Sequence, residues 1–346
     1  MNRVENEAID VAIPVYNAPE LTRRCIESLY RHASARIGHV HVYDNASGQE
    51  TRDMLDGLRL PKLIIHHAPQ NTGFGDAVNR AVERTRSELV LVLNSDVEAS
   101  SDFVSPLLAA LRQDAKLAVV TPAGNTFGGY DLRRYALRSE CVVTHNLYAY
   151  AFLVRRAAFD AVGRFDPAFG LGYFEDSDLS RKLLRAGWWI GIHPESNLYH
   201  AIHGSFGKGA AVSELMGRNR ELYGQRYPEA MRNLLLVSGR TSLQELPAEV
   251  RRELDAFLAG GGAVRWLTRA PLRYLPSLEV RATRGGMVGL ARMIQRDRSR
   301  ERRRFTDLWL TSDASAAVRL GLRAWARAGS RTLRRIEAGG HATAAP

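Results

Sequence analysis

Short runs of apolar residues alternate with helical patterns along the first hundred residues. Four runs predict buried strands, because each is a short apolar stretch bounded by polar or turn-forming residues. They lie at residues 9–15, 39–43, 63–66 and 89–93. Between them, apolar residues at helical spacing predict helices that begin at Pro19, near residue 49 and near Asp76. This alternation predicts an α/β fold with a mainly parallel open sheet flanked by helices.

The pattern is less regular after residue 140. It predicts a strand at 147–154, a loop rich in glycine and aromatic residues at 169–174, and a helix that ends at Gly187. A short strand follows at 188–192, and from about residue 240 the pattern becomes mostly helical with glycine and proline breaks. We therefore expect an α/β domain followed by a helical C-terminal region.

Polar side chains follow each of the four predicted strands of the first half. They are Asn17, Asp44, Asn71 and Asp96. Ligands of open parallel sheets bind at the carboxyl ends of the strands. We expect one edge of the sheet to collect all four side chains.

Asp96 ends the segment Asn94-Ser95-Asp96, which follows the most apolar strand. An oxygen ligand held at the sheet edge suits Mg²⁺ or Mn²⁺, which also bind substrate phosphates. The alternative is that Asp96 caps the next element of structure.

Glu175-Asp176-Ser177-Asp178 places three carboxylates at the start of a predicted helix. The helix dipole and free N–H groups there favour the ionised form, which can accept a proton. An acidic first turn is also ordinary helix design, so a purely structural role stays open.

His200 follows a short apolar stretch, and a neutral imidazole is a common ligand of divalent ions. A structural role is the alternative, and His193 and His203 are nearby competitors. The His-x₂-His spacing without a cysteine partner is a weak zinc signal.

Other catalytic motifs are missing from the sequence. Residues 71–76 lack the Gly-x-Gly-x-x-Gly order of a dinucleotide fingerprint, and no Gly-Lys-Ser/Thr loop is present. No nucleophile elbow occurs, and neither Cys25 nor Cys141 has a setting that indicates activation.

Six motifs in order resemble the family 2 glycosyltransferases, which are inverting enzymes of the GT-A fold that use nucleotide sugars. The resemblance covers about residues 8–230 and is strongest to the rhamnosyltransferase-like branch, which builds bacterial cell-surface polysaccharides on lipid-linked acceptors. The motifs are Pro14-Val15-Tyr16-Asn17, Asp44-Asn45-Ala46-Ser47, Asn71-Thr72-Gly73-Phe74-Gly75 with Asn79, Asn94-Ser95-Asp96, Glu175-Asp176-Ser177-Asp178 and His200.

The resemblance implies a role for each motif. Asp176 would be the general base, supported by Glu175 and Asp178, and Asp96 and His200 would bind a divalent metal, Mg²⁺ or Mn²⁺. The nucleotide would be bound by Pro14, Asn17, Asp44, Asn71, Gly73 and Ser95. The family's metal motif is commonly Asp-x-Asp, but here its first position is Asn94. A neutral amide oxygen is a weaker ligand than a carboxylate. We therefore expect a lower metal affinity than the Asp-x-Asp motif gives, and strict metal dependence stays open.

The implied chemistry is a single displacement at the anomeric carbon of the sugar. A base on one face takes the proton of the acceptor hydroxyl, and a cation on the other face stabilises the departing diphosphate. A retaining mechanism would need a further nucleophilic carboxylate. We expect a nucleotide diphosphate sugar as donor and a glycan or lipid-linked saccharide as acceptor.

Composition and charge refine this picture. The chain has 346 residues, 45% hydrophobic and 25% charged, without an apolar run of membrane-spanning length or an N-terminal secretory signal. Residues 240–346 hold 21 basic and 10 acidic side chains, which accounts for the whole net charge of +11. We expect domains at 1–235 and 236–346, the second arginine-rich and mostly helical.

These features predict a cytoplasmic protein, with its C-terminal region either simply solvated or attached to an anionic membrane surface. The densest basic cluster comprises Arg296, Arg298, Arg300, Arg302, Arg303 and Arg304, and Trp309 and Trp325 would sit at the interface. Two other functions were considered: a sugar-nucleotide nucleotidyltransferase, which should carry a basic glycine-rich phosphate loop, and a non-enzymatic binder of membranes or nucleic acid. The neutral first domain lacks the basic and aromatic pattern of nucleic-acid binding.

Overall fold

A computed structural model describes residues 8–201, 209–239, 246–269, 272–299, 304–329, 331–336 and 342–344. Its contacts divide the chain into two compact units. The first comprises Met1–Leu132 and Leu137–Tyr223, and the second comprises Arg133–Ala136 and Gly224–Pro346. Each unit has its own sheet, with helices packed against it, so each is an α/β structure.

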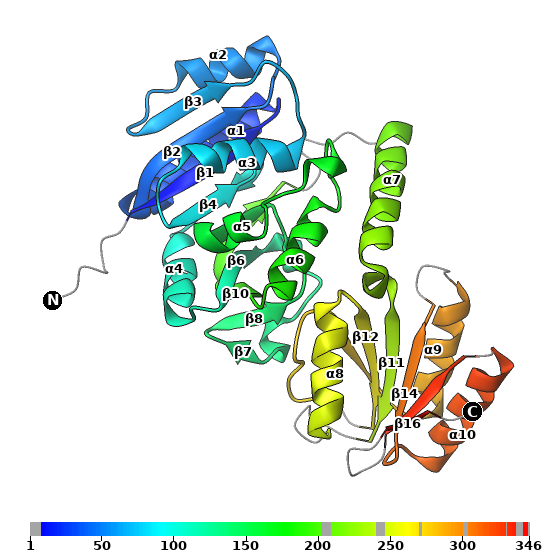
Figure 1. Ribbon diagram of the computed structural model, residues 1–346. Helices are drawn as coiled ribbons and strands as arrows, with labels where there is room; N and C mark the ends of the chain where they lie inside the picture. The colour runs from blue at the N-terminus through cyan, green and yellow to red at the C-terminus, as the bar shows by residue number, and fades with distance from the viewer. Residues whose placement is uncertain are drawn as a thin grey trace. The chain divides into compact units, whose positions relative to one another are not determined.

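The first unit is built on a ten-stranded sheet (Figure 1). Its strands are β1 (Ile9–Val15), β2 (Ile37–Asp44), β3 (Leu63–His67), β4 (Leu89–Leu93), β5 (Val97–Glu98), β6 (Leu117–Gly124), β7 (Leu137–Arg138), β8 (Cys141–Thr144), β9 (Ala151–Arg155) and β10 (Trp189–His200). The order is β3-β2-β1-β4-β9-β6-β10-β8-β7, with β5 paired to β10. Strands β1 to β4 are parallel to their neighbours among these four. Their carboxyl ends therefore share one edge of the sheet.

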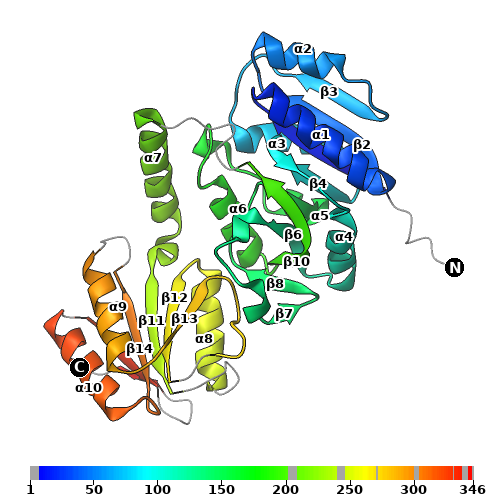
Figure 2. The ribbon, with the colours of Figure 1, turned by 180° about the vertical axis from the view of Figure 1, so that it is seen from behind.

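Helices cover both faces of this sheet. They are α1 (Pro19–Ala33), α2 (Gln49–Gly57), α3 (Phe74–Arg84), α4 (Val104–Gln113), α5 (Arg156–Ala161) and α6 (Glu175–Arg185). Helix α7 (Ala210–Arg226) follows β10 in the chain. Helices α3, α5 and α6 lie on one face, whereas α1 lies on the opposite face (Figures 1 and 2). The fully buried side chains of Val78, Val82, Leu179 and Leu183 recur at helical spacing and pack into one core on that first face. The α/β fold with a mainly parallel sheet is thus as predicted.

Two strands differ from the prediction by four residues or more at one end. The strand expected at 147–154 begins at Ala151, because the backbone N–H of Leu147 donates to the hydroxyl of Ser180 (2.8 Å) rather than to a neighbouring strand. The strand expected to end at residue 192 continues to His200 as β10. A register shift between His193 and Asn197 interrupts its pairing with β6, and this irregularity breaks the apolar pattern that the prediction followed.

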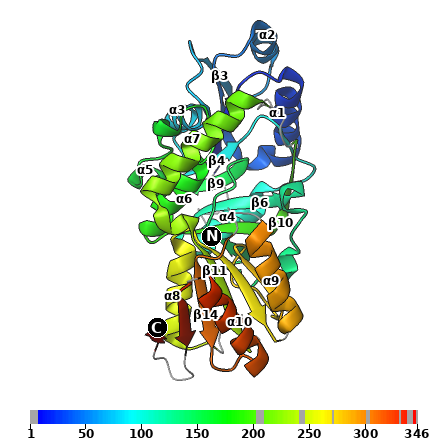
Figure 3. The same cartoon turned by 90° about the vertical axis from the view of Figure 1, so that its right-hand side faces the viewer.

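The second unit holds a six-stranded sheet in the order β13-β12-β11-β14-β15-β16. Its elements are β11 (Asn233–Ser238), α8 (Ala248–Ala259), β12 (Ala263–Thr268), β13 (Val280–Arg284), α9 (Met287–Ser299), β14 (Asp307–Thr311), α10 (Ala316–Ala328), β15 (Leu333–Ile336) and β16 (Ala342–Ala344). Neighbouring strands are parallel except for β16, which is antiparallel to β15. Helix α8 lies on one face of the sheet, and α9 and α10 lie on the other (Figure 3).

The expectation of a mostly helical C-terminal region is therefore wrong. Leu234, Leu235 and Leu236 are consecutive and all fully buried, as in a parallel strand covered on both faces. Such a short apolar run cannot be told from part of a buried helix by its period alone.

Two further expectations concern the surface of this region. Trp309 and Trp325 are each 7% exposed, so the predicted placement of these rings at a membrane interface is wrong. Arg300, Arg302 and Arg303 lie outside the described residues, as does the side chain of Arg298. No helix within the described ranges is both long enough and apolar enough to cross a bilayer.

Candidate functional site

Asn45 links the loop after β2 to the loop after β3 through its side chain, and to the end of β1 through its backbone N–H. Its Nδ2 donates to Oδ1 of Asn71 (2.9 Å) and to the carbonyl of Gly73 (3.3 Å), and its Oδ1 accepts from the N–H of Thr72 (3.1 Å). Its own N–H donates to the carbonyl of Val15 (2.8 Å). The buried side-chain amide of Asn45 thus satisfies the N–H of Thr72 and the carbonyl of Gly73, and it holds the loop after β3 beside its own loop.

Asn17 is tied to the loop after β2 by two further bonds. Its N–H donates to the hydroxyl of Ser47 (2.8 Å), and its Oδ1 accepts from the N–H of Gly48 (2.9 Å). Asn17 has a φ of 58°, a left-handed conformation that asparagine tolerates better than most residues. Pro14 lies just before this loop, buried in β1 opposite Tyr43 of β2.

Asp44 is fully buried at the end of β2, and both of its oxygens have partners. Oδ1 accepts from the N–H of Ser47 (2.8 Å), and Oδ2 lies 2.7 Å from Nδ1 of His67 and 3.5 Å from Nε of Arg52. Burial lowers the pKa of His67, but its hydrogen bonds to Asp44 and Asp56 outweigh that effect and leave the pKa above its ordinary value. A buried carboxylate is therefore compensated by two basic side chains, His67 and Arg52.

Asp96 and His200 face each other across the pairing of β5 with β10. Asp96 Oδ1 lies 3.3 Å from His200 Nε2, and the carbonyl of Asp96 accepts from the N–H of Ala201 (2.9 Å). His200 pairs with Val97, the residue after Asp96. Residues more than one hundred positions apart in the chain thus form one carboxylate–imidazole pair.

The imidazole of His200 is fixed by several contacts. It stacks on the ring of Tyr150, with centroids 4.9 Å apart and an interplanar angle of 11°. Its Nδ1 lies 3.5 Å from the hydroxyl of Thr126, and its backbone exchanges two hydrogen bonds of 2.8 Å with the side chain of Asn125. These contacts orient the ring with Nε2 toward Asp96.

The donor atoms here fit a divalent cation. The turn between β4 and β5 supplies the carboxylate of Asp96 and the buried amide oxygen of Asn94, for which no hydrogen-bond partner is found among the described residues. Ser95 is buried in the same turn. Within the described ranges, no group of three or more His, Cys, Asp or Glu side chains could enclose a metal. Asp96 and His200 would be two protein ligands, and Mg²⁺ or Mn²⁺ would complete its coordination with phosphate oxygens and water.

The three carboxylates at the start of α6 have different surroundings. Asp178 is 1% exposed and pairs with Lys182 (3.0 Å), and Glu175 is 8% exposed. Asp176 is only half-buried, and its Oδ1 accepts from the N–H of Ser177 (2.6 Å). Asp176 is thus the member of this cluster that retains access to solvent.

Burial raises the pKa of both Glu175 and Asp176. The pKa of Glu175 is raised to about 8, first by burial and second by the charge of Asp176. The pKa of Asp176 is also raised by burial, although hydrogen bonds from Ser177 act in the opposite direction. The pair therefore holds protons more tightly than free carboxyls do, which suits a group that accepts one.

The glycine-rich loop before α6 packs directly on the loop after β3. Gly73 has a φ of +91°, and a Cβ added there would lie 2.0 Å from the carbonyl oxygen of Gly170. The N–H of Phe74 donates to the carbonyl of Leu171 (3.2 Å). A Cβ at Gly75 would lie 3.7 Å from Cγ of Glu175. The loop that contains Asn71 therefore lies against the start of α6.

The structure thus brings most of the predicted site residues to one edge of the first sheet. Asp178 and Pro14 lie there but are buried in structural contacts. His193 is buried within β10, where burial lowers its pKa, and His203 lies outside the described residues. His67 belongs to none of the sequence motifs, although its position at the end of β3 places it among the polar residues expected to converge at this edge.

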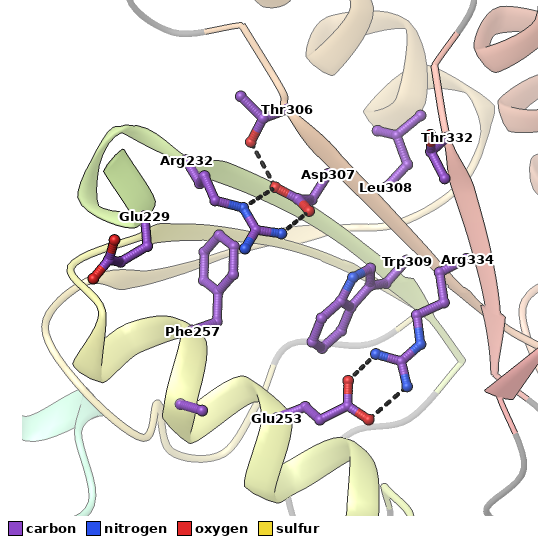
Figure 4. Close-up of a pocket in the computed structure, with 11 residues that line it drawn as sticks. Glu229, Arg232, Glu253, Phe257, Thr306, Asp307, Leu308, Trp309, Thr332 and Arg334 are labelled. Atoms are coloured by element: carbon purple, nitrogen blue, oxygen red, sulfur yellow. Dashed lines mark hydrogen bonds and ion pairs between the residues drawn. The ribbon is translucent and has the colours of Figure 1, made fainter. Parts of the chain in front are cut away.

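A cavity of about 450 Å³ lies elsewhere, in the second unit (Figure 4). It is lined by Glu229, Arg232, Glu253, Ala256, Phe257, Thr306, Asp307, Leu308, Trp309, Thr332 and Arg334. It lies where β11, β14 and β15 begin, and none of the predicted site residues lines it. Arg232 pairs with Asp307 (3.0 Å), and Arg334 pairs with Glu253 (2.6 Å), so its main charges compensate each other.

The raised pKa of Glu175 predicts a pH-dependent stability. Between about pH 4.5 and 8 the unfolded chain releases this proton while the folded chain keeps it, so stability should fall as pH rises through this window. Glu175→Gln should remove a slope of at most about 1.4 kcal/mol per pH unit, measured by urea unfolding from pH 5 to 8.5. Glu83→Gln, at an exposed ion pair with Arg164, is the control and should leave the slope unchanged. Equal slopes for the wild type and Glu175→Gln would contradict the raised pKa.

Sequence comparisons relate part of the first unit to a known protein family. Residues 10–176 match the model of Glycosyl transferase family 2. An N-acetylglucosaminyltransferase of Rhizobium sp. (strain N33) is 30% identical over 114 residues, which are 31% of this chain and 25% of that protein. The uncharacterized glycosyltransferase YfnE of Bacillus subtilis (strain 168) is 28% identical over 110 residues, 32% of this chain and 28% of that one. The chain thus spans about a quarter to a third of the curated relatives it matches.

Comparisons with solved structures concern the fold. S. aureus TarS 1-349 in complex with UDP-GlcNAc has a TM-score of 0.51 at 18% identity, covering 64% of this chain and 66% of that one. GalNAc-T7 with UDP, GalNAc and Mn²⁺ also has a TM-score of 0.51, at 15% identity, covering 73% and 55%. The part of the chain matched by the family model, residues 10–176, is therefore a glycosyltransferase family 2 sequence in an α/β unit with the GT-A fold.

Proposed function

We propose that this chain is an inverting glycosyltransferase. It would transfer a hexose or deoxyhexose from a nucleotide diphosphate sugar to a hydroxyl of a glycan or lipid-linked saccharide, in the synthesis of a bacterial cell-surface polysaccharide. One observation carries the proposal: the Asp96–His200 pair and the start of α6 share a sheet edge with the Asn45-linked loops. A rhamnosyltransferase-like specificity remains part of this proposal.

The loops joined by Asn45 are proposed to bind the nucleotide. Asp44 would recognise the base, with Pro14, Asn17, Asn71, Gly73 and Ser95 lining the nucleoside. These loops are already fixed by hydrogen bonds among themselves, so little ordering would be needed when the donor binds. The two solved structures hold UDP or UDP-GlcNAc, which makes UDP the first nucleotide to test.

Asp176 is proposed as the general base. Its partial exposure lets an acceptor hydroxyl approach, and its raised pKa strengthens it as a proton acceptor. Asp176 would take the hydroxyl proton as the acceptor oxygen bonds to the anomeric carbon, while the bond from that carbon to the diphosphate breaks with its electron pair. Asp96 and His200 would hold a divalent cation, which when bound stabilises the negative charge of the departing diphosphate.

Asp176→Asn tests the role of the base. The amide cannot accept the proton, so kcat should fall about 10²–10⁴-fold while donor affinity stays nearly the same. The measurement is release of nucleoside diphosphate in the presence of acceptor, with titration of the nucleotide for affinity.

Asp160→Asn is the matched control. Asp160 lies on α5 in a surface ion pair with Arg164 (2.7 Å), and its variant should keep wild-type turnover. Wild-type turnover by Asp176→Asn would remove Asp176 from the mechanism. Release of pyrophosphate in place of a nucleoside diphosphate would indicate a nucleotidyltransferase.

His200→Gln tests the metal site without an activity assay. UDP with Mn²⁺ should raise the melting temperature of the wild type more than UDP alone does. His200→Gln removes one of the two proposed protein ligands. The variant should therefore need an Mn²⁺ concentration about tenfold higher or more to reach the same shift in melting temperature. His39→Gln, which changes an imidazole 56% exposed on the surface, should behave like the wild type. An unchanged Mn²⁺ titration in His200→Gln would contradict the proposed site.

An anionic membrane surface is proposed as a further partner, supported by the basic excess of residues 240–346. Because Trp309 and Trp325 are buried, the attraction would be electrostatic. The full chain should therefore sediment with vesicles containing phosphatidylglycerol at low salt and be released at high salt. Equal recovery with neutral and anionic vesicles would reject this attachment.

A further inference from the structure

The loop that leads into α6 has an unusual backbone. Tyr173 and Phe174 both have positive φ, 71° and 73°, and Gly170 has a φ of 63°. Two consecutive non-glycine residues in the left-handed region cost energy and persist where surrounding contacts hold them. The next residue is Glu175, so this conformation sets the position of the first turn of α6 and the direction of Asp176.

One side chain from α7 holds this loop. Asn219 is fully buried, and its Nδ2 donates to the carbonyls of Phe169 (2.6 Å), Gly172 (2.7 Å) and Tyr173 (3.1 Å). A carboxamide is suited to this task because its NH₂ group carries two hydrogens that three converging carbonyl oxygens can share.

Contacts next to Asn219 extend the same attachment. The guanidinium of Arg218 donates to the carbonyl of Ala168 (2.7 Å). The ring of Tyr223, one turn further along α7, lies 5.4 Å from the ring of Phe174. Helix α7 therefore contacts both ends of the loop, near Ala168 and at Phe174.

The opposite side of the loop contacts the proposed nucleotide-binding region. Leu171 accepts a hydrogen bond from Phe74, and Gly170 packs on Gly73, as described above. The loop is thus held between α7 and the loop after β3. A shift of this loop would change the position of Asp176 relative to the proposed donor site.

We propose that Asn219 is a positioning residue for sugar transfer, which acts by holding loop 169–174 so that Asp176 faces the acceptor hydroxyl beside the donor. This inference rests on the role proposed above for Asp176. Without the amide, three carbonyls lose the hydrogen bonds from Asn219, and Tyr173 and Phe174 are released toward ordinary backbone conformations. The loops that bind the nucleotide keep their own hydrogen bonds through Asn45, so donor affinity should survive the change.

Asn219→Ser is the test variant, because it removes the amide but keeps one short hydroxyl donor. We expect kcat to fall at least tenfold, while the dissociation constant for UDP changes less than threefold. The double variant Asn219→Ser/Asp176→Asn should have nearly the same kcat as Asp176→Asn alone, because a residue that acts through Asp176 adds little once that base is gone. Hydrogen–deuterium exchange of the peptide covering residues 169–174 should rise at least tenfold in Asn219→Ser.

Ser196→Ala is the matched control. Ser196 is also fully buried and also donates to a backbone carbonyl, that of Phe103 (2.6 Å), but Phe103 immediately precedes α4. This variant should lose stability without loss of kcat. If Asn219→Ser unfolds, Arg218→Gln removes the exposed bond to Ala168 and should show a smaller effect of the same pattern.

The outcomes separate this inference from the proposed function. Wild-type turnover by Asp176→Asn would overturn the role of the base and, with it, the catalytic part of the inference. If Asp176→Asn is inactive but Asn219→Ser keeps wild-type kcat, the positioning role is wrong and the proposed function stands. Fully multiplicative losses in the double variant would likewise overturn it, because they would show that Asn219 acts independently of Asp176.

Discussion

The loops at the carboxyl ends of the strands in the first sheet have no neighbouring strand to pair with. Their buried backbone groups must therefore find other hydrogen-bond partners. Asn45 and Asn219 provide those partners. Each is a buried asparagine whose amide is shared among backbone groups of loops distant in sequence. Because an unsatisfied buried carbonyl or N–H costs about 1–3 kcal/mol, these amides hold the loops in specific conformations. The side chains proposed for chemistry are positioned as a consequence.

Gly73 allows the loop after β3 to contact the loop before α6. Gly73 lies so close to Gly170 that any side chain at position 73 would displace the loop before α6. The loop after β3 and the loop that leads into α6 are thus in direct backbone contact.

The sequence predicted β1 to β4 well, because each is a short apolar run and each polar cluster follows its strand. The polar residues after these strands then lie at one edge of the sheet, because the four strands are parallel. Asn219 could not be found in this way, because its carbonyl partners lie some 50 residues earlier in the chain and a single asparagine within a helix gives no periodic signal. The second sheet was missed for a related reason. Runs such as Leu234–Val237 are short enough to belong to either a buried strand or a helix, and the arginines of β15 obscure its apolar character.

The three carboxylates of α6 illustrate how burial divides roles among similar groups. Asp178 is paired with Lys182, so it is compensated and directed away from solvent. Burial and the charge of Asp176 raise the pKa of Glu175, so this carboxyl ionises less readily than a free one and is less available as a nucleophile. Asp176 is left as the accessible member of the cluster. A retaining mechanism needs one carboxylate as nucleophile and a second group as acid and base. With a single available carboxylate in the cluster, direct displacement assisted by one base requires fewer groups, which supports the inverting reaction we propose.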